Sequence, residues 1–479
     1  MTDPDRSRAH WALFGLGLAI SLLMLARVQV AGDGISLLSR GWLLAAKGIW
    51  VPLGNPVASS AGGYVPGGLT ALVVGLPLEL WMHPRAPVVL ILLCHVFAYL
   101  MLDRVVGEAL GGRARLVFAV VYWLNPWRLY QSAWLDNSNY VFLTGALHTW
   151  ACYRQRHTPS FLHSALLVGG VGLTFQLHVD AMILVIAAVL LWLRGGWRPH
   201  WGGVAVGAAV TVGALVPFFL EVAREPRLLP GSEGYVGRNL VQIWPPFKGA
   251  LYWFRYASLD CSKSLLVFDF TPAFGARADA LLMPLFSMLR RLASLTVVVS
   301  VAANLWLWRR RRASPFAGTG DPASARGWLG EYALWTFVAC FIANALSPSV
   351  VTWWHNLIAL HAAVLPLVLG ADALLATPRA PWVRRGMAAW AALSVILLLG
   401  MAFAGDQYRQ GGRDPVEYVL ESDHEMVRDL GLADCCGVSL DPEKGAWPRK
   451  NSYFYVHYVR PFLIPPPAPD DAPPLIRWD

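Results

Sequence analysis

Long apolar runs recur along this chain from residue 11 to residue 404. A helix of about 20 apolar residues crosses the ~30 Å hydrocarbon core of a bilayer, and repeated runs of this kind are typical of polytopic membrane proteins. Only 14% of the residues are charged, whereas soluble proteins carry about 25%. The sequence therefore predicts an all-α integral membrane protein.

The positions of the arginines indicate which runs span. The apolar runs cover residues 11–27, 67–81, 87–103, 114–130, 138–152, 160–176, 179–193, 201–220, 292–308, 331–346, 357–372 and 386–404. Short loops between them are rich in arginine, which is typical of cytoplasmic loops. These loops all fall on one side only if the run at 67–81, which Pro77 interrupts, does not span. We therefore expect about eleven spanning helices, with the N-terminus in the cytoplasm and the C-terminus outside. These loops also explain the net charge of +9, so no nucleic-acid partner is expected.

The first external loop, 28–86, is expected to hold two interfacial helices. The first lies at 35–49, where apolar residues recur at helical spacing and basic residues occupy the other side. Its apolar side comprises Ile35, Leu38, Trp42, Ala45 and Ile49, and its polar side comprises Ser36, Arg40 and Lys47. The second is the short run at 67–81, which we expect to rest flat in the outer interface.

The rest of the chain divides into a transmembrane domain, 1–404, and an external tail or small domain, 405–479. The transmembrane domain includes a long external loop at 223–290. Cys261 in that loop and Cys435 and Cys436 in the tail are external by this topology, where disulfides are allowed. A bond from Cys261 to one member of the pair is a prediction.

Several chemically active side chains fall on the predicted external face, and each has a structural alternative. Asp33 and Asp136 are candidate catalytic acids, but both sit where an acid commonly caps a helix. His178 is either a substrate-binding residue or a satisfied histidine of a turn. His355 follows Trp353 and Trp354, so it is either a binding residue or part of an aromatic interface belt.

Residues 11–195 resemble the GT-C superfamily of membrane glycosyltransferases, which includes the oligosaccharyltransferase catalytic subunit, protein O-mannosyltransferases and bacterial aminoarabinose transferases. The resemblance rests on the order and spacing of five segments. They are "GDG" after the first helix, "GNPVASSAGGYVPGGL", "LDRVVGEALGGRAR", "VYWLNPWRLYQSAWLDNSNY" and "GLTFQLHVDAMILVIAAVLLWLR". The later half of the chain is similar only in hydropathy.

The resemblance implies transfer of a sugar from a polyprenyl-phosphate donor to a hydroxyl of a glycan, lipid or protein acceptor, on the external face of a bacterial inner membrane. Asp33 corresponds to the general base of an inverting reaction, and Asp136 to a second acid that supports the site. The sequence has Asp33-Gly34 where protein O-mannosyltransferases have Asp-Glu, and it has Asp-Asn-Ser-Asn at 136–139 instead of an Asp-x-Asp motif. Metal dependence is therefore not carried over, and no cofactor or metal ligand is assigned.

This chemistry needs few groups. A lipid phosphate is already a good leaving group, so one base for the acceptor hydroxyl suffices, together with cations for the departing phosphate. The candidate cations are Arg128, Lys263, Arg290, Arg291, Arg40 and Lys47, whose alternative role is to bind lipid headgroups. The candidate substrate-binding residues are His178, His355, Asn137 and Tyr64.

Two other classes of function remain open from the sequence. A lipid-linked glycan transporter or flippase also has many helices, but it is expected to carry charged residues within its spans or a repeat between its halves. A glycan polymerase or ligase is expected to use a long late external loop, which 223–290 provides.

Overall fold

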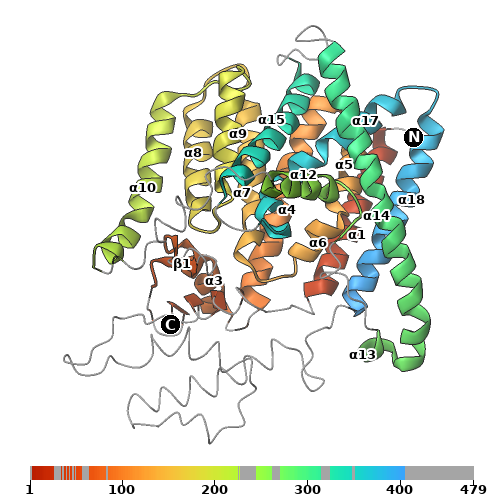
Figure 1. Cartoon of the computed structure of the whole chain (residues 1–479), viewed down its shortest axis with the longest axis horizontal. Helices are drawn as coiled ribbons and strands as arrows, with labels where there is room; N and C mark the ends of the chain where they lie inside the picture. The colour runs from red at the N-terminus through yellow and green to blue at the C-terminus, as the bar shows by residue number, and fades with distance from the viewer. Residues whose placement is uncertain are drawn as a thin grey trace, which may run out of the picture.

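The computed structural model describes residues 3–25, 34, 37–38, 40–41, 44–45, 48, 50–56, 64–81, 83, 85–224, 226, 244–261, 270–313, 324–347 and 351–404. Its helices form one bundle (Figure 1). They are α1 (Asp3–Leu25), α3 (Leu69–Leu80), α4 (Arg85–Leu110), α5 (Gly112–Phe118), α6 (Pro126–Gln131), α7 (Val141–Arg154), α8 (Phe161–Phe175), α9 (Ala181–Leu193), α10 (Trp201–Arg224), α12 (Trp244–Tyr256), α13 (Thr271–Phe274), α14 (Ala276–Ala313), α15 (Ala325–Leu346), α16 (Leu360–Ala363), α17 (Leu365–Leu375) and α18 (Ala380–Ala404). A π-helical segment, η1 (Ala119–Trp123), and two 3-10 segments, η2 (Asn137–Asn139) and η4 (Trp353–Ala359), complete the helical elements discussed below.

The helical membrane-protein prediction is confirmed. Seven of the described helical segments are long and apolar enough to cross a bilayer, and each coincides with a predicted span. The other four predicted spans also form helices, but α7, α8 and α9 are shorter, and the run at 114–130 is divided into α5, η1 and α6. The count of eleven is therefore not confirmed.

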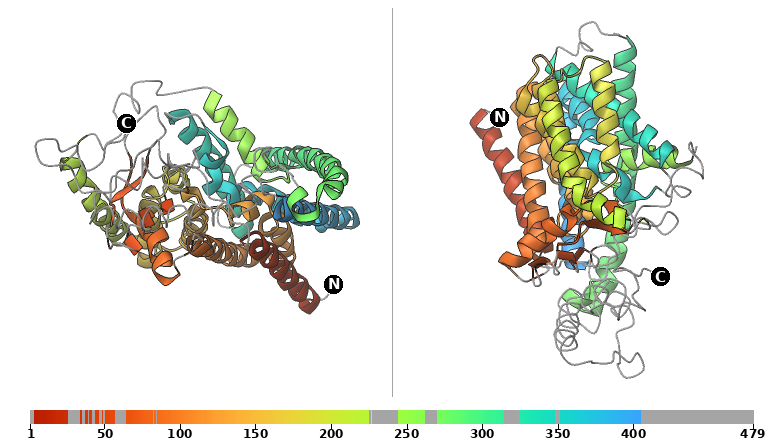
Figure 2. Two further views of the ribbon diagram at one scale, coloured as in Figure 1. Left: turned by 90° about the horizontal axis from the view of Figure 1, so that it is seen from below. Right: turned by 90° about the vertical axis from the view of Figure 1, so that its left-hand side faces the viewer.

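The arginine-rich loops gather at one end of the bundle, which we call the basic end. Arg113 before the π-helical segment and Arg326 at the start of α15 both donate to Asp372 near the end of α17. Other contacts link further loops to this end: Arg115 with Asp103, His10 with Asp103, Arg154 with Glu108, the Arg198 amide with the Gln155 carbonyl, and the Trp328 indole with the Gly196 carbonyl. The loops therefore share one side of the bundle, as the arginine pattern predicts (Figure 2).

Helix α3 lies at the opposite end, which we call the site end (Figures 1 and 2). Its Leu69 amide donates to the side chain of Gln176, in the turn between α8 and α9. The Tyr140 hydroxyl lies 3.5 Å from the Val73 carbonyl of α3 and 3.3 Å from the Pro87 carbonyl at the start of α4. The first two turns of α3 therefore lie near this end of the bundle, beside the start of α4. Its length of 12 residues corresponds to about 18 Å, too short to cross the bilayer.

The segment before α3 buries Leu38 of the predicted apolar side, but it also buries a residue of the predicted polar side. Among its described helical residues, Gly41 packs closely on Val74 of α3, and Leu44 packs closely on Gly75. Arg40 is consequently buried, with 1% of its surface exposed, so the prediction that it lies on the exposed polar side is wrong. Leu37, Leu38, Arg40 and Gly41 are buried, and Leu44 and Ala45 are half-buried. The small residues Gly41 and Gly75 allow the two helices to approach.

A short antiparallel ribbon joins this segment to α3. It consists of β1 (Leu53–Pro56) and β2 (Tyr64–Pro66), with Leu53 opposite Pro66 and Pro56 opposite Tyr64. Gly67 follows with φ +100° and lies against Gln176, where a β-carbon would come within 2.3 Å of the side-chain oxygen. Glycine is required here because L-residues rarely adopt this φ and because no side chain fits.

Two boundaries in the region 223–290 differ from prediction. Helix α14 begins at Ala276 rather than at 292, because Pro284, Arg290 and Arg291 interrupt the apolar pattern without breaking the helix. Helix α12 does not lie outside the bundle: the Trp253 indole donates to Asn304 of α14, and the Phe254 ring lies 6.0 Å from the Phe337 ring in the middle of α15. Helix α12 is thus packed against spanning helices well inside the bundle (Figure 1).

Candidate functional site

Three turns at the site end converge on one polar cluster. They lie between α6 and α7, between α8 and α9, and at the start of η4. We call Asp136, Asn137, His178, Asp180 and His355 from these turns the turn cluster. The sequence analysis named Asp136, Asn137, His178 and His355 as candidates, and the structure brings these residues together with Asp180.

A hydrogen bond joins the first two turns directly. The side-chain amide of Asn137 donates to the carbonyl of Leu177 across 2.6 Å, and Asn137 is 6% exposed. Its oxygen also accepts from the Ser138 amide at 3.1 Å. Buried polar groups of this kind are costly to leave unpaired, so Asn137 fixes the position of the turn that carries His178.

The two histidines face each other across the cluster. The Nδ1 atom of His178 lies 3.2 Å from a carboxylate oxygen of Asp180, and the rings of His178 and His355 are 6.1 Å apart. His178 and Asp180 are almost buried. The Nδ1 atom of His355 accepts from the Thr352 amide at 2.8 Å, in a reciprocal cap at the start of η4. His355 therefore has a structural role as well as a place in the cluster.

Asp136 is half-buried and caps the η2 segment, accepting from the Ser138 amide at 2.8 Å. Burial raises the pKa of this carboxyl above its ordinary value, while the hydrogen bonds from Ser138 and the nearby His178 oppose the rise. The structure thus shows the capping role that the sequence left open, and it also places the carboxyl within electrostatic reach of His178 and Asp180.

Helix α12 adds a cation that sequence reasoning missed. Lys248 lies within electrostatic reach of His355. The helix is held in place at its end, where the Tyr256 hydroxyl donates to the carbonyl of Trp353 in η4. The sequence feature that could have identified this lysine is the segment "WPPFKGALYWFRY". It is rich in proline and aromatic residues, which are suited to burial, and Lys248 is its single lysine.

Tyr64 and Arg40 lie together at the site end. The Arg40 guanidinium is 5.8 Å from the centre of the Tyr64 ring, and both side chains are buried. Tyr64 is three residues before Gly67. Gly67 packs on Gln176, which is two residues before His178. The structure therefore brings this cation and this tyrosine to the same end of the bundle as the turns.

Arg128 occupies the bundle interior beside α1. It is fully buried, its Nε donates to the Trp123 carbonyl at 2.8 Å, and its guanidinium lies 3.7 Å from the centre of the Trp123 ring. A further nitrogen is 3.4 Å from the Ser21 hydroxyl of α1, whereas Nη1 has no hydrogen-bond partner. Arg128 forms no ion pair with a carboxylate of the described residues, which is unusual for a buried cation.

Of the remaining sequence candidates, the two that the structure describes, Arg290 and Arg291, lie away from the cluster. Arg290 is half-buried and Arg291 is exposed on α14, and α14 lies on the opposite side of the bundle from α8 and α9 (Figure 1). Asp33, Lys47 and Lys263 lie outside the described residues, as do Cys435, Cys436 and the tail at 405–479. Among the described residues, no group of three or more His, Cys, Asp or Glu side chains has an arrangement that could hold a metal ion.

These features define a polytopic helical membrane protein with a polar site at one end and short helices beside it. No protein-family model matches the sequence, and no curated protein matches it at a significant level. Solved structures similar to it include those of ArnT from Cupriavidus metallidurans bound to undecaprenyl phosphate and in the apo state. Both have a TM-score of 0.53 and cover 94% of this chain and 84% of that chain, at 13% and 12% identity respectively. The chain therefore has the GT-C fold, as its sequence resemblance implies.

Proposed function

We propose that this protein is a GT-C glycosyltransferase of a bacterial inner membrane that uses a polyprenyl-phosphate-linked sugar as donor. The sugar passes to a hydroxyl of a glycan, lipid or protein acceptor at the site end, which faces outward. The similar fold of ArnT, one of whose structures holds undecaprenyl phosphate, supports this proposal. The arginine-rich basic end supports the orientation, with the N-terminus in the cytoplasm.

The observation that carries the proposal is an apolar groove of about 600 Å³ between α3 and α4. Its walls include Leu72, Val73 and Leu76 of α3 and Val89, Leu90 and Leu93 of α4. Leu69 also lines the groove, and its amide donates to the side chain of Gln176, two residues before His178 of the turn cluster. A polyprenyl chain in this groove has its phosphate near the polar turns without leaving the bilayer.

In the proposed reaction, Asp33 accepts the proton of the acceptor hydroxyl. The hydroxyl oxygen forms a bond to the anomeric carbon while the bond from that carbon to the phosphate oxygen breaks, with inversion of configuration. Polyprenyl phosphate leaves with the electron pair. Cations near the cluster, Lys248 and Arg40 among them, stabilise its charge, and Arg128 is retained as a candidate because its buried charge has no carboxylate partner.

A transfer assay on membranes, with a panel of polyprenyl-phosphate sugars, tests the proposal. Asp33→Asn is expected to insert normally and to lose transfer, whereas wild-type turnover in this variant removes Asp33 from the mechanism. Absence of transfer from every donor in the panel by the wild-type protein, under conditions where it remains folded, counts against the activity itself.

A second experiment tests the groove. Leu90→Trp narrows it, so the KM for a long-chain donor is expected to rise while the KM for a short-chain analogue stays constant. Phe97→Trp is the matched control, because Phe97 is exposed about two turns further along α4 and does not line the groove. Equal effects of the two substitutions argue against a polyprenyl chain in this position.

A further inference from the structure

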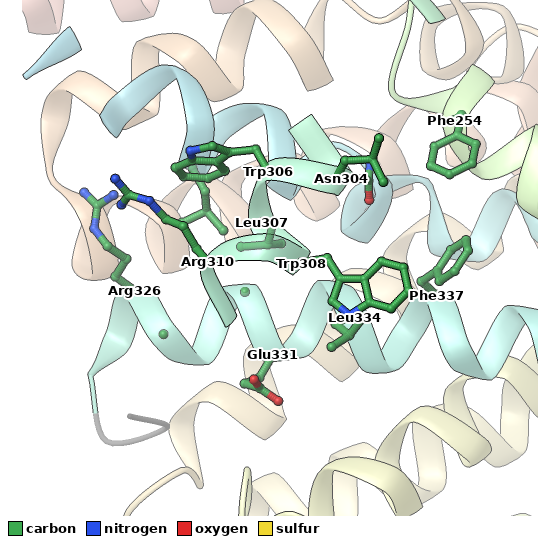
Figure 3. A pocket seen from close by; sticks show the side chains of 14 residues that line it. Phe254, Asn304, Trp306, Leu307, Trp308, Arg310, Arg326, Glu331, Leu334 and Phe337 are labelled. Atoms are coloured by element: carbon green, nitrogen blue, oxygen red, sulfur yellow. The ribbon is translucent and has the colours of Figure 1, made fainter. Parts of the chain in front are cut away.

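A second cleft lies between α14 and α15, away from the turn cluster. It has a volume of about 200 Å³ and extends from Arg310 and Arg326 at the basic end to Phe254 and Phe337 (Figure 3). From Arg326 to Phe337, the cleft follows eleven residues of α15, or about 16 Å at the helical rise. That depth is close to one leaflet of a ~30 Å hydrocarbon core.

The interior of this cleft suits a hydrocarbon chain. Its walls are formed largely by Trp306, Leu307, Leu334 and Phe337 (Figure 3). The side-chain oxygen of Asn304 accepts from the Trp253 indole, and Glu331 accepts from the Trp335 indole at 2.9 Å. These polar groups are therefore paired within the protein, which leaves an apolar space.

The cleft opens toward the bilayer. Leu305 and Trp308 line it and are 47% and 49% exposed. On the same helix, Leu295 and Val298 are 65% and 68% exposed, as expected of a lipid-facing surface. A lipid chain therefore enters from the side without crossing the protein.

The mouth of the cleft is cationic. Arg310 is exposed, lies 4.8 Å from the centre of the Trp306 ring, and forms no ion pair with a carboxylate of the described residues. Arg326 is held by its bond to Asp372, whose other oxygen accepts from Arg113. The Arg326 guanidinium has five N–H donors and is 41% exposed, so donors remain for an anionic group.

We propose that this cleft binds an anionic phospholipid of the leaflet at the basic end, with one acyl chain between α14 and α15 and the phosphate at Arg310 and Arg326. Basic pockets between spanning helices bind anionic headgroups in this manner. The one-leaflet depth favours a phospholipid over polyprenyl phosphate, whose chain is much longer. This site does not depend on the proposed glycosyl transfer.

Native mass spectrometry of the full-length protein tests the site with three probes: phosphatidylglycerol, phosphatidylcholine of the same acyl chains, and undecaprenyl phosphate. The wild-type protein is expected to retain phosphatidylglycerol in preference to phosphatidylcholine. Arg310→Gln is expected to weaken that retention about fivefold, the effect of removing one arginine near an anionic lipid. Arg309→Gln is the matched control, because Arg309 is exposed beside Arg310 but does not line the cleft.

A second variant tests the acyl-chain position. A β-carbon at Gly330 would lie 3.3 Å from Leu307 across the cleft, so Gly330→Leu fills the space and is expected to abolish selective retention. Equal retention of the two phospholipids, tighter retention of undecaprenyl phosphate, or unchanged retention in Arg310→Gln overturns the proposal. If Gly330→Leu elutes as an aggregate, Arg310→Gln decides the question alone, since it changes only an exposed side chain.

Discussion

The side-chain amide of Asn137 and the carbonyl of Leu177 are joined by a hydrogen bond of 2.6 Å, which connects two turns of the candidate site. Asn137→Ala leaves this carbonyl without its partner, at a cost of about 1–3 kcal/mol. Because the turn of His178 then loses its support, we expect transfer activity to fall by up to about 100-fold, the effect of a displacement near 1 Å at a reacting centre.

Asn139→Ala is the control for this prediction. The Asn139 amide donates to the Trp134 carbonyl at 2.7 Å, within its own turn, so its loss costs similar stability without separating the two turns. Apparent melting temperature and the kcat of transfer, measured on both variants, distinguish positioning from stability. Equal losses of activity in the two variants contradict the positioning role of Asn137.

Asp136 is expected to show separable capping and electrostatic roles. Asn is as good a cap as Asp, whereas Ala loses the cap at a cost of about 0.5–2 kcal/mol. At neutral pH, Asp136→Asn should therefore have a melting temperature at least as high as the wild-type protein, and Asp136→Ala should have a lower one than Asp136→Asn. If Asp136 also supports the reaction, both variants lose transfer activity, and wild-type activity in Asp136→Asn assigns the residue to capping alone.

Because the pKa of Asp136 is raised, the stability of the folded protein is expected to fall as the pH rises. Its carboxyl holds a proton more readily in the folded protein than in the unfolded one, because burial disfavours the charge. Its contribution to stability is therefore complete below the unfolded value of about 3.9 and is lost as the pH rises through the folded value. Melting curves collected from pH 4 upward should show this loss in the wild-type protein and a smaller one in Asp136→Asn. Parallel curves for the two proteins contradict the assignment.

Lys248 is expected to contribute to binding of the donor phosphate. A hydrogen bond to a charged group contributes about 1.5–3 kcal/mol, so Lys248→Gln should weaken donor binding by roughly 10–150-fold. Lys248→Arg keeps the charge and should retain part of the affinity. The measurement is the dissociation constant of a non-transferable polyprenyl-phosphate analogue, with Lys248→Gln checked for intact folding. An unchanged constant places the phosphate elsewhere.

The sequence predicted much of this architecture because hydropathy and arginine position act over whole segments. The non-spanning α3 followed from length and charge together, since a short run containing Pro77 both fails to cross and restores the sidedness of the loops. Side-chain burial within the first loop was not predictable in the same way. Arg40 lies on the buried side because Gly41 and Gly75 permit close packing, which is a relation between two helices rather than a pattern within one.

The same reasoning explains why the sequence placed the turns on one face but did not identify Lys248. Each turn is short, so its position follows from alternation of the spans, and His178 and His355 could be assigned to one face. Helix α12 has too few apolar residues for a span, and its place within the bundle depends on tertiary contacts such as that of Trp253 with Asn304.

The buried carboxylate at the basic end gives the last prediction. Asp372 is fully buried and accepts from Arg113 and Arg326, whose side chains are 39% and 41% exposed. Removing both arginines leaves a buried charge without a cation, which costs about 3–5 kcal/mol. Asp372→Asn removes the charge itself and leaves two arginines that reach water, so it should cost less. The double variant that combines Arg113→Ala and Arg326→Ala should therefore have a lower melting temperature than Asp372→Asn. Arg379→Ala, an exposed arginine without an ion pair among the described residues, should match the wild-type protein. The reverse order of the first two variants would show that Asp372 does not depend on these arginines for its burial.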